Sequence, residues 1–144
     1  MLRKSFSFLV LLGMASIMAG CGEEKEPTPT QKWGPDVQSV REKIFRDGTI
    51  TRQLNDYRMH AGQYPTTEQG LKALFKRPQG VDPKSWAGPY IENEDEIKDK
   101  WGNELHYACP GKTYPDKTDQ YDLWSLGPDG QDGTKDDILN HNVR

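Results

Sequence analysis

The feature that most constrains this chain is how its apolar residues are divided along it. The first 21 positions hold 14 of the 48 hydrophobic residues, mostly in the run from Phe6 to Met18. The remaining 123 residues hold 34, about 28%, which is a small supply for a hydrophobic core. We therefore expect one small, loop-rich domain stabilised by an ion, a partner or a tether. A helical bundle and a multi-pass membrane protein are excluded.

The apolar run has the organisation of an export signal. Arg3 and Lys4 precede it, and the small residues Ala19 and Gly20 follow it immediately before Cys21. Its 13 residues are short for a bilayer, which takes about 20 in a helix. An uncleaved anchor helix is therefore the less favoured alternative, and we predict that residues 1–20 are a signal peptide.

The end of this run resembles a bacterial lipobox. In Met18-Ala19-Gly20-Cys21 the resemblance implies cleavage before Cys21 and acylation of its sulfur, for example by palmitate. Gly22 after the cysteine favours the outer membrane. We expect a lipoprotein of the cell envelope, anchored to the bilayer through acylated Cys21 on the periplasmic face of the outer membrane or at the cell surface. The second cysteine, Cys109, is then left either buried or paired between molecules, and burial is favoured.

A polar spacer separates this cysteine from the folding part of the chain. Residues 22–32 contain no apolar side chain, and prolines alternate with threonines. We predict a flexible tether over residues 21–34 that begins with the lipidated cysteine, and a domain over residues 35–144.

The domain begins with a helical pattern from Pro35 to about His60. Val37, Val40 and Ile44 share one face, and a second apolar stripe follows on a rotated face. Gly48 lies between the two stripes, where a bend or break is expected because glycine costs about 1 kcal/mol in a helix.

A short helix and a hairpin are predicted after it. Thr66 and Gln69 have the spacing of a capping box, ahead of Leu71, Leu74 and Phe75. After the Trp101-Gly102-Asn103 turn the residues alternate: one face carries Leu105, Tyr107 and Cys109, and the other Glu104, His106 and Ala108. A second strand is expected over 121–126.

These pieces together resemble the major pseudopilin, protein G, of type II secretion systems. The resemblance rests on YPTTEQGLKAL at residue 64, the WGN turn, and SLGPDG followed by DDI, and it covers residues 36–138. It implies an α+β, pilin-like fold, in which an N-terminal helix packs on a small antiparallel sheet and a C-terminal loop binds calcium. The ligands it implies are the carboxylates of Asp129, Asp136 and Asp137 and the carbonyl oxygens of Leu126 and Thr134.

The residues of this loop suit calcium independently of the resemblance. Four aspartates, Asp129, Asp132, Asp136 and Asp137, lie within nine residues. Calcium takes six to eight oxygen ligands, and close carboxylates repel unless a cation lies between them. The alternative is a solvated acidic turn, because Asp-Gly pairs are common in turns.

Charge and motifs exclude other functions. Without its leader the chain carries 17 basic and 22 acidic residues and no basic patch, which disfavours nucleic-acid binding. No catalytic motif occurs, and alternation places His106 and Cys109 on opposite faces, so no catalytic residue is assigned.

We therefore expect a non-enzymatic, membrane-tethered pseudopilin-like lipoprotein. It would be a component or accessory of a type II secretion-like system, stabilised by calcium, with other secretion subunits as partners. The alternative is a surface lipoprotein that reuses the fold as a calcium-dependent binding module. The chain departs from the family at its start, where a lipobox and a spacer replace a Gly-Phe cleavage site and a spanning apolar helix.

Overall fold

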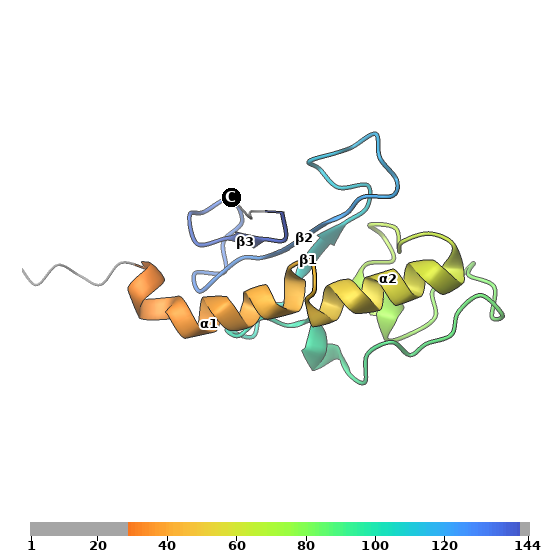
Figure 1. The fold of residues 1–144 in the computed structure, drawn as a ribbon, viewed down its shortest axis with the longest axis horizontal. Helices are drawn as coiled ribbons and strands as arrows, with labels where there is room; N and C mark the ends of the chain where they lie inside the picture. Colours follow the sequence, from red (N-terminus) through yellow and green to blue (C-terminus); the bar gives the residue numbers. More distant parts are fainter. Residues whose placement is uncertain (1–28, 142–144) are drawn as a thin grey trace, which may run out of the picture.

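Two helices lie end to end along one side of the molecule (Figure 1). The computed structural model describes residues 29–141, and the predicted signal peptide and Cys21 lie outside this range. Helix α1 spans Pro29–Ile44 and helix α2 spans Thr49–Ala61. The break that Gly48 predicted between two apolar stripes is confirmed. The structure has no helix, within the described residues, of the length and apolarity needed to cross a membrane.

The start of the helix was predicted wrongly. It begins at Pro29 and not at Pro35, so α1 extends into the stretch expected to be a flexible tether. Pro29 costs no hydrogen bond, since the first N–H groups of a helix have no partner inside it, and the helix also accommodates Pro35 in its interior, where proline has no N–H to donate. Spacer-like composition therefore did not exclude a helix.

The break between the helices depends on a close backbone approach. Gly48 lies against the end of α1, and a Cβ built on it would clash with the Lys43 carbonyl and lie 2.8 Å from the Ile44 nitrogen. The Thr51 hydroxyl, in the first turn of α2, donates to the Ile44 carbonyl oxygen over 2.9 Å. This hydrogen bond gives the last carbonyl of α1 a donor. Four residues, Phe45 to Gly48, connect α1 to α2.

We expect Gly48→Ala to lower the free energy of unfolding by about 1–3 kcal/mol, because the added methyl group must displace backbone atoms. Gly34→Ala is the control: apart from its chain neighbours nothing lies within 4 Å of its built Cβ, so its effect is limited to the local restriction before Pro35. Urea unfolding followed by circular dichroism measures both. If Gly48→Ala is as stable as the parent chain, the close contact between residue 48 and the Lys43 carbonyl does not require glycine.

The sheet has three antiparallel strands in the order β1-β2-β3. Strand β1 spans His106–Ala108, β2 spans Asp122–Ser125 and β3 spans Ile138–Leu139. The expected hairpin is confirmed by the pairing of His106 with Trp124 and of Ala108 with Asp122. Strand β2 is the central strand and is buried along its whole length, and the short β3 was not predicted.

The predicted alternation agrees with the burial of this strand. Leu105, Tyr107 and Cys109 are buried, whereas Glu104 and His106 are exposed. Ala108, predicted on the same face as His106, is only 5% exposed. The reason is Asp122, the residue paired with Ala108 on β2. Its carboxylate accepts a hydrogen bond from the loop that follows β1, and this loop covers Ala108.

The core lies where the helices meet the sheet and two short 3-10 helices. Helix α1 contacts β2 and β3, and α2 contacts η1, which spans Leu71–Leu74. Fully buried side chains include Ile44, Leu54 and Leu123. The predicted capping box ahead of η1 is confirmed: the Thr66 N–H donates to Gln69 Oε1 over 3.0 Å, and the Gln69 N–H donates to Thr66 Oγ1 over 3.3 Å.

Lysine 43 joins α1 to the second 3-10 helix, η2, which spans Glu94–Ile97. Its Nζ donates to the Lys98 carbonyl oxygen over 2.7 Å and to the Glu96 carbonyl oxygen over 3.4 Å. Desolvation by burial lowers the pKa of Lys43, partly opposed by the carboxylates of Glu96 and Asp99. Together these contacts fix the segment that leads into the Trp101-Gly102-Asn103 turn beside α1.

Candidate functional site: the acidic C-terminal loop

The predicted calcium ligands lie in the loop that joins β2 to β3. Leu126 follows the last residue of β2, and Asp137 precedes the first residue of β3. The loop begins at Gly127, which has a φ of 67°, and a Cβ there would lie 2.7 Å from Asp136 Oδ2. The pairing of β2 with β3 therefore brings the two ends of the loop together. Only glycine fits at position 127, where the backbone lies against Asp136.

The acidic side chains are engaged with the backbone and with Thr134. Asp136 Oδ2 accepts from the Asp129 N–H over 3.2 Å, and Asp137 Oδ2 accepts from the Gly133 N–H over 2.8 Å. The Thr134 hydroxyl lies between the two carboxylates, 2.6 Å from Asp136 Oδ1 and 3.4 Å from Asp129 Oδ1. Asp129 and Asp136 are thus connected to each other, whereas, within the described residues, Asp137 hydrogen-bonds only to the loop backbone.

The protonation of Asp136 follows from these contacts. Its desolvation acts to raise the pKa, but hydrogen bonds from the Thr134 hydroxyl and the Asp129 N–H outweigh it and hold the pKa below its ordinary value. Asp136 is therefore ionised at neutral pH and can act as an anionic oxygen ligand.

The donor set fits calcium in part. Asp137 Oδ1 is buried and has no hydrogen-bond partner, which is the state expected of an oxygen kept for a cation. On the other hand, no three acidic, histidine or cysteine side chains within residues 29–141 form a group able to hold a metal ion. Asp129, Asp136 and Asp137, with the carbonyls of Leu126 and Thr134, would have to draw together around calcium, and the ion would neutralise their mutual repulsion.

The base of the loop is held by residues that sequence reasoning missed. The Ser125 hydroxyl donates to Asp99 Oδ2 over 2.7 Å and accepts from the Gly127 N–H over 3.1 Å. Asn103 Nδ2 donates to the Gly127 carbonyl oxygen over 3.2 Å. The Trp101-Gly102-Asn103 turn therefore supports the acidic loop. The sequence feature that could have predicted this turn is Asp99, because an aspartate side chain often accepts a hydrogen bond from the backbone N–H two residues later.

The histidines and the cysteine do not form a catalytic arrangement among the described residues. His106 is exposed and its ring lies 5.3 Å from that of Trp124, while Cys109 is buried on the opposite face, as alternation predicted. Desolvation by burial raises the pKa of the Cys109 thiol, which disfavours the reactive thiolate. His60 lies in the last turn of α2 and stacks on Tyr90, with ring centroids 5.8 Å apart.

Comparison with known proteins decides the family. Residues 35–141 match the family model described as type II secretion system (T2SS), protein G. The chain belongs to the type II secretion system protein G family. The match includes α1 from Pro35 onward, the whole of α2, the sheet and the whole acidic loop.

Curated relatives of the family are named type II secretion system core protein G. The one from Vibrio cholerae is 35% identical over 76% of this chain and 77% of the relative. The one from Escherichia coli K12 is 41% identical over 74% of each chain. A solved structure, the major pseudopilin from the type 2 secretion system of enterohaemorrhagic Escherichia coli, has a TM-score of 0.57 and 35% identity over 76% of this chain and 89% of that one. The pilin-like α+β fold implied by the sequence motifs is therefore confirmed.

Proposed function

We propose that this protein is a membrane-tethered, non-enzymatic pseudopilin-like component or accessory of a type II secretion system, stabilised by calcium. The observation that carries the proposal is the family match over residues 35–141, together with the shared fold. Family membership supports a place in the cell envelope and other secretion subunits as partners. The finer parts of the proposal, the lipid tether and the calcium, rest on Cys21 and on the acidic loop.

The lipid tether is supported by sequence alone. The lipobox Met18-Ala19-Gly20-Cys21 and the charged start of the leader are the features that a lipoprotein signal needs. Anchoring by an acyl group places the domain at a bilayer surface through covalent chemistry and not through a membrane-spanning helix. In this arrangement the polar segment before Pro29 separates the domain from the membrane.

We expect the mature chain to begin at an acylated Cys21, with a mass that shows two or three acyl groups. Cys21→Ser should release the protein from the membrane fraction, whereas Cys109→Ser, the matched control, should remain there because this thiol is buried in the domain. Intact-mass spectrometry and membrane fractionation measure both results. An intact leader, or a cut elsewhere, would remove the tether from the proposal.

Calcium is proposed to stabilise the fold through the acidic loop. The loop connects β2 to β3 and is tied to the turn at Asn103, so an ion that fixes it also fixes the edge of the sheet. Binding to the folded state alone adds to stability by mass action. The partly assembled ligand set and the unpartnered Asp137 Oδ1 support this role.

Association with secretion subunits distinguishes the proposal from a free-standing binding module. We propose in-cell cross-linking of the full-length protein followed by identification of the cross-linked chains. Recovery of other subunits of the secretion system supports a component or accessory role. A protein that never cross-links to them would favour the surface binding module that the sequence left as an alternative.

A further inference from the structure

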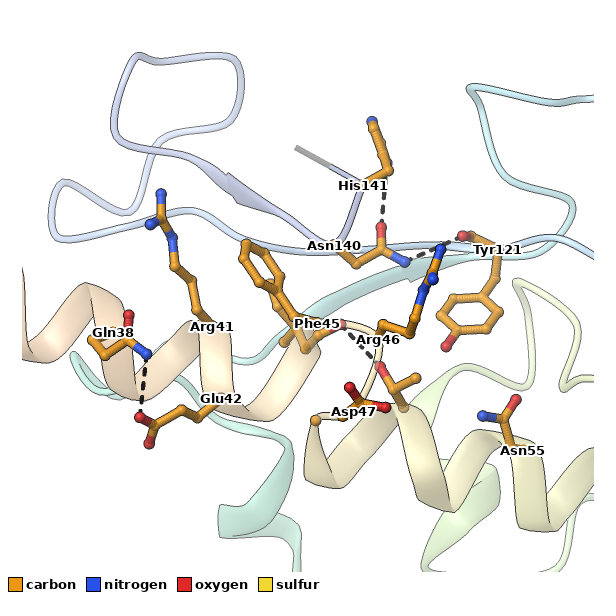
Figure 2. Close-up of a pocket in the computed structure, with 13 residues that line it drawn as sticks. Gln38, Arg41, Glu42, Phe45, Arg46, Asp47, Asn55, Tyr121, Asn140 and His141 are labelled. Atoms are coloured by element: carbon orange, nitrogen blue, oxygen red, sulfur yellow. Dashed lines mark hydrogen bonds between the residues drawn. The ribbon is translucent and has the colours of Figure 1, made fainter. Parts of the chain in front are cut away.

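A cleft of about 1030 Å³ opens beside the break between α1 and α2 (Figure 2). Its lining comes from the second half of α1, from the turn Phe45 to Gly48, from α2, and from the residues that flank β2 and β3. This volume is at the upper end of the range for ligand sites in proteins, about 300–1,000 Å³. Neither the calcium ligands nor Cys21 contribute to it.

The inner surface of the cleft is fixed by hydrogen bonds. Thr51 is bound to the Ile44 carbonyl, and both residues are buried. Asn140 accepts from the Leu123 N–H over 3.2 Å, and its amide donates to the Tyr121 carbonyl oxygen over 3.5 Å. Burial raises the pKa of the Tyr121 phenol to about 12, so this group is neutral at physiological pH. The cleft is therefore preformed, which reduces the cost of ordering it around a partner.

The wall that faces the strands carries two arginines and a half-buried aromatic ring. Figure 2 shows Phe45 between Arg41 and Arg46 on the strand-facing side of the helix and the turn, with Arg46 directed toward Asn140 and Tyr121. The Arg41 guanidinium lies 5.5 Å from the centre of the Phe45 ring. Within residues 29–141, neither arginine has an acidic side chain within 4 Å. Both guanidinium groups are therefore free to bind a carboxylate.

The acidic groups of the cleft do not neutralise this wall. Glu42 accepts a hydrogen bond from Gln38 over 3.2 Å, and both side chains lie on the opposite side of α1 in Figure 2. Asp47 lies in the exposed turn at the edge of the cleft. Across from the arginines, the buried Asp122 carboxylate accepts from the Thr113 N–H over 3.0 Å and lies 3.7 Å from His141 Nδ1.

We propose that this cleft binds an acidic segment of a partner protein. Carboxylates of the segment lie against Arg41 and Arg46, and an aromatic side chain between them packs on Phe45. Guanidinium groups bind carboxylates through two parallel hydrogen bonds, and they do so more strongly where the cleft wall excludes water. The inference concerns a surface beyond the calcium site and the tether and does not depend on either of them.

The test uses the purified full-length chain and a labelled peptide, acetyl-Glu-Glu-Phe-Glu-Glu-amide, in fluorescence polarisation. We expect saturable binding that weakens as salt is added, since charge attraction is screened. Arg46→Glu and Arg41→Glu should each weaken binding on the order of tenfold. Arg52→Glu is the matched control, because Arg52 is exposed on α2 outside the cleft, and it should bind as the parent does.

Five outcomes would overturn the proposal. The first three are no binding at peptide concentrations up to about 1 mM, equal binding of the peptide with glutamine in place of glutamate, and equal loss in the Arg52→Glu control. The fourth is displacement of the peptide by equimolar inorganic phosphate, which would show a site for small anions. Sedimentation that shows self-association abolished by Arg46→Glu would assign the cleft to a second copy of the chain and also count against a partner segment. Melting curves of each variant establish that it is folded.

Discussion

Replacing Asp99 by alanine is expected to lower the free energy of unfolding by about 3–5 kcal/mol. The Asp99 carboxylate is 7% exposed and accepts from the N–H groups of Trp101 and Asn103 over 2.9 and 2.8 Å. It also accepts from the Ser125 hydroxyl over 2.7 Å. Alanine leaves these donors without partners in a buried place, and each unsatisfied donor costs about 1–3 kcal/mol.

Urea unfolding of the purified chain measures this effect. Asp95→Ala is the matched control, because its carboxylate is exposed and its contact with Lys98 is a surface ion pair, so its transition should coincide with that of the parent. Asp99→Asn keeps one acceptor oxygen and should lie between alanine and the parent. If Asp99→Ala unfolds at the same urea concentration as the parent chain, the contacts of Asp99 contribute nothing to stability.

Removal of calcium is expected to have the second large effect, a fall of about 10 °C in melting temperature. The expectation assumes an ion concentration about 100 times the dissociation constant, which is worth about 2.7 kcal/mol in a domain of this size. Differential scanning calorimetry with added calcium and with excess chelator measures the difference. The same heating curve in both solutions would refute calcium stabilisation.

Variants of the loop locate the ion. Asp129→Ala and Asp137→Ala should abolish the response to chelator, because each removes a proposed ligand. Asp132→Ala is the control: it removes an exposed carboxylate of the same loop that is not a proposed ligand, and it should keep the response. Loss of the response in the Asp132→Ala variant alone would place the ion elsewhere in the loop.

Local patterns predicted the elements of this fold well. The capping box at Thr66 and Gln69 and the break at Gly48 depend on residues close in sequence, and the two predicted strands form the expected hairpin. In these places the chemistry of neighbouring residues decides the conformation. The start of α1 was wrong because the prolines of the spacer were taken as evidence against a helix in general, although a first turn tolerates proline.

Contacts between distant segments could not be predicted in the same way. The support of the acidic loop joins Asp99 to Ser125 and Asn103 to Gly127, pairs that only the folded backbone brings together. The cleft lined by Arg46 and Asn140 likewise combines the helix turn with the end of the chain. Sequence spacing identifies which side chains are available, while the three-dimensional packing decides which of them meet.

The brevity of β3 limits how copies of this protein can join. Strand β3 forms one edge of the sheet and contains only Ile138 and Leu139, and the other edge, β1, contains only three residues. So few unpaired main-chain groups cannot template another strand, which protects the protein from aggregation by edge-to-edge pairing. Higher-order assemblies are therefore expected to use side-chain contacts, and point substitutions on the surface should suffice to dissolve them.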